Sequence, residues 1–180
     1  MDTRAGQSSH RPSRRFITTH DQVTGKSVYI NVTEQDPTPI SSFGAATRSY
    51  STPVLPAQLA DDEDLKAFLD LTGIASYTGQ NIVIPGGANL ILLDLIPGAV
   101  GHMHRTVSLD FSICVKGEIE HELDSGEKVR LLPGDHIIQR GTMHRWLNAS
   151  KTDPARLIAV ILPCQPFELA GQSIEETHLS

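Results

Sequence analysis

The chain has 180 residues, with 15 Lys and Arg against 21 Asp and Glu, and a formal net charge of −6. This length favours one globular domain, and an acidic chain without a basic stripe lacks the charge pattern of nucleic-acid-binding proteins. No apolar run approaches the roughly 20 residues that a membrane helix needs, and no apolar segment follows the arginines near the N-terminus. We therefore expect a soluble, cytoplasmic protein without nucleic-acid or membrane partners.

The N-terminal part divides into a tail and a structured region. Residues 1–13 mix Ser, Arg, Gly and Pro without periodic apolar residues, which predicts a disordered tail. Residues 14–76 begin with two β-branched runs, RRFITTH and KSVYINV, joined by a short polar link, and these predict an antiparallel hairpin. The segment Glu34–Gln58 contains four prolines, which predicts a long wrapping loop across one barrel opening.

One helix is expected in the N-terminal region. In ADDEDLKAFLDLTG the acidic residues complement the positive end of a helix dipole, Leu65, Phe68 and Leu69 make an apolar stripe, and Gly73 ends the pattern. The pattern predicts a helix over Asp61–Leu71.

The second half of the chain is expected to be β-structure. Residues 77–165 hold short apolar runs such as NLILLDLI and ARLIAVILP, broken by Gly and Pro turns, and this predicts an all-β sandwich or barrel. Residues 166–180 follow as a C-terminal tail. The first two strands, near Arg15–Thr19 and Lys26–Val32, leave edges if unpaired, so we expect a homodimer that pairs them.

The eight histidines are not equivalent. Three of them, His102, His104 and His144, lie where a strand is expected to open or close. In an extended chain residues i and i+2 point to one face, so His102 and His104 can converge, and Thr106, Ser108 and Asp110 continue the same face. The others are expected to be solvated (His10, His20, His178) or structural (His121, His136).

These residues carry a resemblance to a known family. The spacing of Gly98, His104, Thr106, Asp110 and Gly117 resembles the first cupin motif, and Pro133, Gly134, Gly141, His144 and Asn148 resemble the second. The resemblance covers roughly residues 82–163 and is similar to small single-domain fungal and bacterial cupins. It implies a double-stranded β-helix, that is, a jelly-roll barrel, in agreement with the pattern of strands and turns.

The motif departs from the family at two positions. The positions held by Thr106 and Asp110 are ordinarily His and Glu in a metal-binding cupin. His102 can compensate, so one hypothesis is a divalent metal (Zn, Fe, Mn or Ni) held by His102, His104 and His144, with Asp110 as an optional oxygen ligand. The other hypothesis is direct acid–base chemistry without metal.

The remaining candidate residues complete the predicted site. Arg140 stands at the expected rim, where it can clamp a carboxylate or make a structural ion pair. Trp146 shares parity with His144 and is either a pocket wall or core. We expect the catalytic residues to be His104, His144, Asp110 and Arg140, and the substrate-binding residues to be Thr106, Ser108 and Trp146.

Three functions fit such a site. The first is a lyase, isomerase or decarboxylase that acts on a small organic metabolite, polyketide-like or carboxylated, because the resemblance implies tailoring enzymes of secondary metabolism. The second is a metal-dependent dioxygenase. The third is a cupin that binds a small molecule without catalysis, since a fold alone does not specify chemistry.

Overall fold

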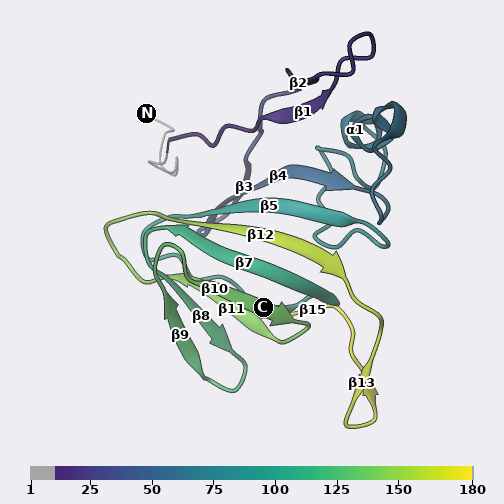
Figure 1. Ribbon diagram of the computed structural model, residues 1–180. Helices are drawn as coiled ribbons and strands as arrows, with labels where there is room; N and C mark the ends of the chain where they lie inside the picture. Colours follow the sequence, from purple (N-terminus) through teal and green to yellow (C-terminus); the bar gives the residue numbers. More distant parts are fainter. Residues whose placement is uncertain (1–10, 180) are drawn as a thin grey trace.

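The computed structural model describes residues 11–179 and consists mainly of antiparallel strands (Figure 1). The larger sheet has the order β10-β7-β12-β5-β4-β3. Its strands are β3 (Thr38–Ile40), β4 (Gly44–Thr52), β5 (Ala88–Leu95), β7 (Ser108–Lys116), β10 (His136–Arg140) and β12 (Ala155–Pro163). The smaller sheet, in the order β15-β6-β11-β8-β9, contains β6 (His104–Arg105), β8 (Ile119–Leu123), β9 (Lys128–Leu131), β11 (His144–Asn148) and β15 (Thr177–His178). The expected double-stranded β-helix is confirmed.

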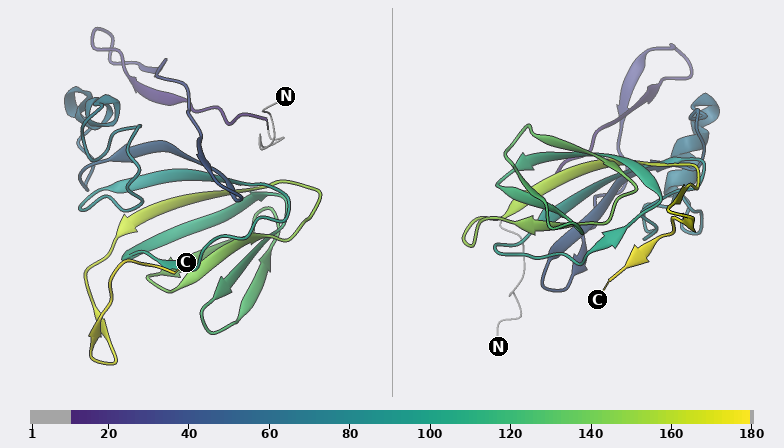
Figure 2. Two further views of the ribbon diagram at one scale, coloured as in Figure 1. Left: turned by 180° about the vertical axis from the view of Figure 1, so that it is seen from behind. Right: turned by 90° about the horizontal axis from the view of Figure 1, so that it is seen from below.

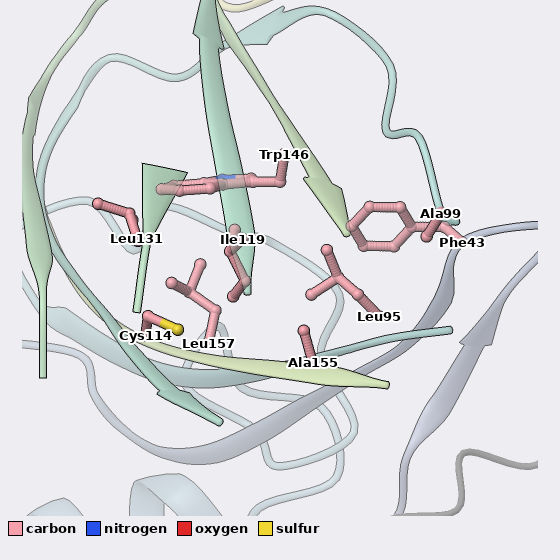
Figure 3. Close-up of a cluster of buried hydrophobic side chains, with 9 residues drawn as sticks. All are labelled: Phe43, Leu95, Ala99, Cys114, Ile119, Leu131, Trp146, Ala155 and Leu157. Atoms are coloured by element: carbon pink, nitrogen blue, oxygen red, sulfur yellow. The ribbon is translucent and has the colours of Figure 1, made fainter. Parts of the chain in front are cut away.

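The apolar core fills one half of the space between the sheets (Figure 3). Leu95, Cys114 and Leu157 reach it from the larger sheet and are fully buried, while Ile119 and Trp146 reach it from the smaller sheet. These side chains point toward one another in Figure 3 and exclude water from that half. The other half of the barrel contains the site described below.

The predicted N-terminal hairpin is present but lies outside both sheets. Strands β1 (Ile17–His20) and β2 (Ser27–Ile30) pair only with each other and project from the barrel (Figures 1 and 2). Two contacts fix the hairpin to the rest of the protein. Arg15 Nη1 donates to the Ser49 carbonyl at 2.8 Å, and the Thr19 hydroxyl donates to the Asp62 carboxylate at 2.7 Å.

The segment expected to be a loop, residues 34–58, contains two strands of the larger sheet. The prediction of a loop was wrong because the prolines lie outside β4 or in β3. Strand β4 contains no proline, and Pro39 lies in β3, at the edge of the sheet. An edge strand tolerates proline since its outward amide needs no ladder partner. Strand β4 pairs with β5 along its whole length, so this segment builds a barrel wall.

The predicted helix is shorter than expected. Residues Ala60–Asp62 form a 3₁₀ turn, and α1 spans Glu63–Leu69. Asp61 and Asp62 have positive φ angles of 54° and 55°, which a continuous helix does not allow. At the other end the Asp70 carboxylate accepts the Thr72 amide at 2.9 Å, a local bond that competes with helix continuation. In residues 11–179 no helix is long and apolar enough to cross a membrane.

The C-terminal segment, expected to be a tail, contains three short strands. Strands β13 (Glu168–Leu169) and β14 (Gln172–Ser173) form a small hairpin. Strand β15 then returns to the barrel and pairs with β6, placing Thr177 opposite Arg105 and His178 opposite His104. The end of the chain therefore borders the histidine motif.

We predict that the β1–β2 hairpin mediates a homodimer. Phe16 and Tyr29 contact each other edge-on at 6.3 Å, yet they are 67% and 76% exposed, and an isolated two-stranded hairpin is at best marginally stable in water. Light scattering should give twice the chain mass of 19.6 kDa. The double substitution Phe16→Ser, Tyr29→Ser should give monomers, whereas Val23→Ser at the exposed hairpin tip should leave the dimer intact. A monomeric wild-type protein at micromolar concentration would refute this prediction.

Candidate active site

A cavity of about 530 Å³ occupies the barrel half that the core leaves free. Strands alternate their side chains between two faces, so every second residue of β4, β5, β12 and β7 points inward. The larger sheet contributes Arg48, Asn89, Ile91, Asp110, Leu157 and Ile161, among others. The opposite wall contains His102, His104, Thr106, His144, Trp146 and His178. Most of the surface is apolar, with a few polar groups, as in binding sites for small molecules.

His104 and His144 lie side by side on two adjacent strands of the smaller sheet. They are direct register partners in the antiparallel pair β6–β11, and their ring centroids are 4.3 Å apart. The paired strands thus bring together two histidines from motifs far apart in sequence. Both motif histidines therefore lie side by side in the wall of the cavity.

The hydrogen bonds of these two rings define their tautomers. His104 Nδ1 lies 3.0 Å from the His102 carbonyl oxygen, and His144 Nδ1 lies 3.0 Å from the Thr142 carbonyl oxygen. A carbonyl oxygen only accepts, so each Nδ1 must carry the proton. In the neutral ring Nε2 then keeps its lone pair, available to take a proton or to bind a metal ion.

Burial keeps both rings neutral. Burial, together with the smaller effect of the neighbouring His104, lowers the pKa of His144 to about 3. The pKa of His104 is also lowered, chiefly by burial and also by His178 and His102 nearby. Both imidazoles are therefore uncharged bases near neutral pH.

His121 packs against the ring of His144 and is itself held by a hydrogen bond. Gln139 donates its amide N–H to the Thr142 carbonyl at 2.8 Å, which orients its Oε1 toward His121 Nε2, also at 2.8 Å. Because Oε1 only accepts, His121 Nε2 must donate. The ring packs 5.3 Å from His144 and 4.6 Å from Trp146, consistent with the structural role expected for it.

Asp110 is a buried carboxylic acid on the facing wall. It is 6% exposed, and its Oδ1 atom has no hydrogen-bond partner. Burial raises the pKa of Asp110 to about 6, although a hydrogen bond from Ser108 opposes the shift. In residues 11–179 no hydrogen bond joins Asp110 to either motif histidine, although all three side chains line the same cavity.

The other predicted residues are only partly brought together. Thr106 and Trp146 line the cavity, and Trp146 is also part of the apolar core. Ser108 is buried and 2.7 Å from the Thr106 hydroxyl, but it does not line the cavity. Arg140 is exposed at the end of β10 and is not among the lining residues, so its expected role as a carboxylate clamp has no structural support.

Among the described residues, the side chains that could bind a metal ion in the cavity do not form a complete ligand set. In the part of the chain that the structure describes, no three His, Cys, Asp or Glu side chains converge in a metal-binding arrangement. His104 and His144 offer two Nε2 lone pairs, but His102 is exposed and contributes its carbonyl to His104 rather than its ring to the pair. Catalytic zinc sites use three protein ligands, so this set does not fit one.

Among the cavity residues that the sequence analysis missed, three carry groups that matter for the chemistry of the site: His178, Arg48 and Asn89. His178 stacks nearly parallel to His104, with ring centroids 5.9 Å apart, and its Nε2 lies 3.1 Å from a Glu176 carboxylate oxygen. Arg48 and Asn89 line the opposite wall. No motif marks them, because β15 pairs over a long sequence distance and β4 lies in a segment expected to be a loop.

Comparison with known proteins adds the family. Residues 91–161 match the cupin domain model. Phomopsin biosynthesis cluster protein D of Diaporthe leptostromiformis is 37% identical over 165 residues, covering 90% of this chain and 84% of that protein. The chain belongs to the cupin family. Another relative of this cupin, the cupin-domain-containing oxidoreductase srdB of Neurospora crassa, is 32% identical, covering 89% of this chain and 79% of the relative.

A solved structure is also similar. An uncharacterized conserved protein with a double-stranded beta-helix domain from Klebsiella pneumoniae superposes on this cupin with a TM-score of 0.42. It is 20% identical and covers 52% of this chain and 75% of that chain.

We predict that Asp110→Asn stabilises this cupin at pH 7. A folded-state pKa raised from 3.8 to about 6 means that ionisation of Asp110 opposes folding, by up to about 3 kcal/mol once the group is fully ionised. The contribution of Asp110 to stability is therefore intact below pH 4 and lost as the pH rises through 6. Thermal denaturation should show a higher melting temperature for Asp110→Asn at pH 7, and a much smaller gain at pH 4.

The matched control is Asp124→Asn, in the exposed turn between β8 and β9. It should leave the melting temperature unchanged at both pH values. If Asp110→Asn is less stable than the wild type at pH 7, the buried carboxylate has a stabilising partner and the account of Asp110 is wrong.

Proposed function

We propose that this cupin is an acid–base enzyme, of the lyase, isomerase or decarboxylase class, that acts on a small organic metabolite. The observation that carries the proposal is the His104–His144 pair at the cavity, with His144 buried, His104 half-buried and both Nε2 lone pairs free. A barrel interior without function would favour apolar filling, because a buried imidazole needs hydrogen-bond partners. The cavity volume of about 530 Å³ suits a small molecule.

The two walls support different parts of the reaction. The Nε2 atom of His104 takes a proton from the substrate, and the bond from His104 Nδ1–H to the His102 carbonyl stabilises the imidazolium that forms. His144, whose pKa is lowered to about 3, is the weaker base of the pair. Asp110, whose pKa is raised to about 6, is protonated in about a tenth of the molecules at pH 7, and this fraction can return a proton to the substrate. Proton removal on one side and delivery on the other is the requirement of isomerases and lyases.

Metal chemistry is a separate hypothesis for the same residues. A bound divalent metal would polarise a carbonyl or activate water, and the expected ligands were His102, His104 and His144. The described donor set does not assemble these three rings, so no step of the proposed mechanism passes through a metal.

The relatives support a metabolic role and favour a second candidate. The phomopsin relative is named for a biosynthesis cluster, which supports a small metabolite as substrate. The Neurospora crassa relative is named an oxidoreductase, which favours oxidation of the bound metabolite as the alternative reaction. Oxidation changes the hydrogen or oxygen content of the product, whereas isomerisation leaves its mass unchanged.

We predict that His104→Ala and His144→Ala each lower conversion on the order of a hundredfold or more, because a positioned general base contributes at least that much. The substrate source is an extract of a host strain in which the gene is deleted, and the readout is mass spectrometry after adding purified protein. An unchanged mass indicates an isomerase, loss of a small fragment a lyase or decarboxylase, and loss of two hydrogens or gain of oxygen an oxidoreductase. His136→Ala, an exposed histidine on β10, should retain full conversion.

Two further outcomes separate the remaining hypotheses. Conversion that survives chelator treatment supports direct acid–base chemistry, while conversion lost to chelator and restored by Zn, Fe, Mn or Ni supports the metal route. An active His104→Ala, His144→Ala double variant overturns the role of the pair. A wild-type protein that retains a metabolite from the extract without changing it is a binding protein.

A further inference from the structure

Arg48 is a buried cation in the cavity wall. Its side chain is 8% exposed and comes from β4, facing the same space as the histidine pair. Three of its five N–H groups donate to backbone carbonyls: Nη1 to Ile74 at 3.2 Å and to Ser76 at 2.7 Å, and Nη2 to Asn81. The Nε–H has no partner, and one Nη2 hydrogen remains.

The guanidinium has no compensating carboxylate. In residues 11–179 no Asp or Glu pairs with Arg48, and burial, which lowers its pKa, has no opposing charge nearby. Two other arginines show what is missing. Arg145 and Arg156 each bind a carboxylate through Nε and Nη2, to Glu122 at 2.8 and 2.9 Å and to Asp94 at 2.5 and 2.8 Å. At Arg48 the same two nitrogens retain donor capacity.

The surroundings of Arg48 are built to hold it in place. The carbonyls that accept its hydrogen bonds come from residues 74–81, and a side-chain carbon at Gly79 would collide with Arg48 Nη1. A buried charge costs free energy unless it is paired, so a guanidinium fixed in a cavity without a carboxylate points to an anionic ligand.

Asn89 lies beside Arg48 and adds an acceptor. Arg48 pairs with Ile91 on β5, and Asn89 is two residues away on the same face of that strand. Both amide hydrogens of Asn89 are used, toward the carbonyls of Asn81 at 3.3 Å and Ile82 at 2.9 Å, while its buried Oδ1 has no partner. This oxygen requires a donor from the ligand, such as a hydroxyl group.

The register of the larger sheet gives the distance from Asn89 to Asp110. Ile161 on β12 pairs with Asn89 on one side and with Asp110 on the other. Asn89 and Asp110 are therefore two strands apart, about 10 Å at the usual strand spacing. A ligand held at Arg48 and Asn89 extends from there toward Asp110.

We infer that the cavity binds a small organic carboxylate, whose carboxylate group accepts hydrogen bonds from Arg48 and whose hydroxyl group donates to Asn89 Oδ1. This inference deepens the proposed function by naming the substrate class. The carboxylate group of the substrate serves for binding and lies far from Asp110. The reacting atoms therefore belong to another part of the substrate. Within the proposed function this favours an isomerase or lyase over a decarboxylase.

The test compares two probes that differ in one group. Salicylate carries a carboxylate and a hydroxyl group, and salicylamide replaces the carboxylate with a neutral amide. Calorimetry on the wild-type protein at pH 7 should give about tenfold or more tighter binding of salicylate, the contribution expected from a buried charge-assisted contact. Equal affinities for the two probes, or no binding of salicylate at millimolar concentration, would overturn the inference.

Two variants show which arginine is responsible for the preference for salicylate. Arg48→Met should reduce salicylate affinity to that of salicylamide, and its circular dichroism spectrum shows whether the fold is retained. Arg140→Met, which removes the exposed arginine expected from sequence to be the clamp, should change neither affinity. Loss of the carboxylate preference in Arg140→Met but not in Arg48→Met would overturn the assignment, and the probe comparison on the wild type stands even if Arg48→Met does not fold.

The carboxylate-binding test and the conversion test of the proposed function can fail independently. A protein that prefers salicylate but converts no metabolite retains the carboxylate site and loses the proposed acid–base role. A protein that depends on His104 and His144 for conversion but shows no preference for salicylate keeps the catalytic role and loses this inference.

Discussion

The pairing of the segment around β6 with β11 is the contact on which the site depends. Strand β6 has only two residues, but the backbone before it is already bound to β11: the Asn148 amide donates to the Ala99 carbonyl at 2.9 Å, and the Gly101 amide donates to the Trp146 carbonyl at 2.9 Å. The register then shifts by one residue, because Val100 pairs with Leu147 whereas His104 pairs with His144. This shift is what places His104, and not Met103, opposite His144. The same backbone supplies the carbonyl that fixes the His104 tautomer. The chemistry of the pair is thus set by main-chain geometry.

The barrel divides its interior between stability and function. Along β5, β7 and β12 the residues at one end, such as Leu95, Cys114 and Leu157, pack the core. At the other end the same strands carry Asn89 and Asp110, which are buried with polar atoms that have no partner, and β4 adds Arg48. Such groups reduce stability unless a ligand satisfies them, and natural proteins tolerate this cost at functional sites. The apolar core at one end offsets the cost of a polar cavity at the other.

Sequence reasoning predicted the part of the site that follows strand periodicity. The cupin spacing placed His104, Thr106, Asp110 and His144 on inward faces, and the structure brings all four to one cavity. It failed where long-range pairing decides the position. His178 reaches the cavity only because β15 pairs with β6, and Arg48 only because a proline-flanked segment forms β4. Arg140 is the opposite case: it is close to the motif in sequence, but it is exposed at the end of β10 and does not line the cavity.

The proposed chemistry requires neutral His104 and His144 rings, with the proton on Nδ1 and the lone pair on Nε2. Two-dimensional ¹⁵N–¹H NMR of the histidine rings measures this directly, because the protonated and unprotonated ring nitrogens have separate chemical shifts. We expect both rings to show the Nδ1–H tautomer at pH 7, and neither to become an imidazolium until the pH falls below the ordinary histidine pKa of 6.5. A proton on Nε2 of either ring, or an imidazolium at pH 7, would contradict it.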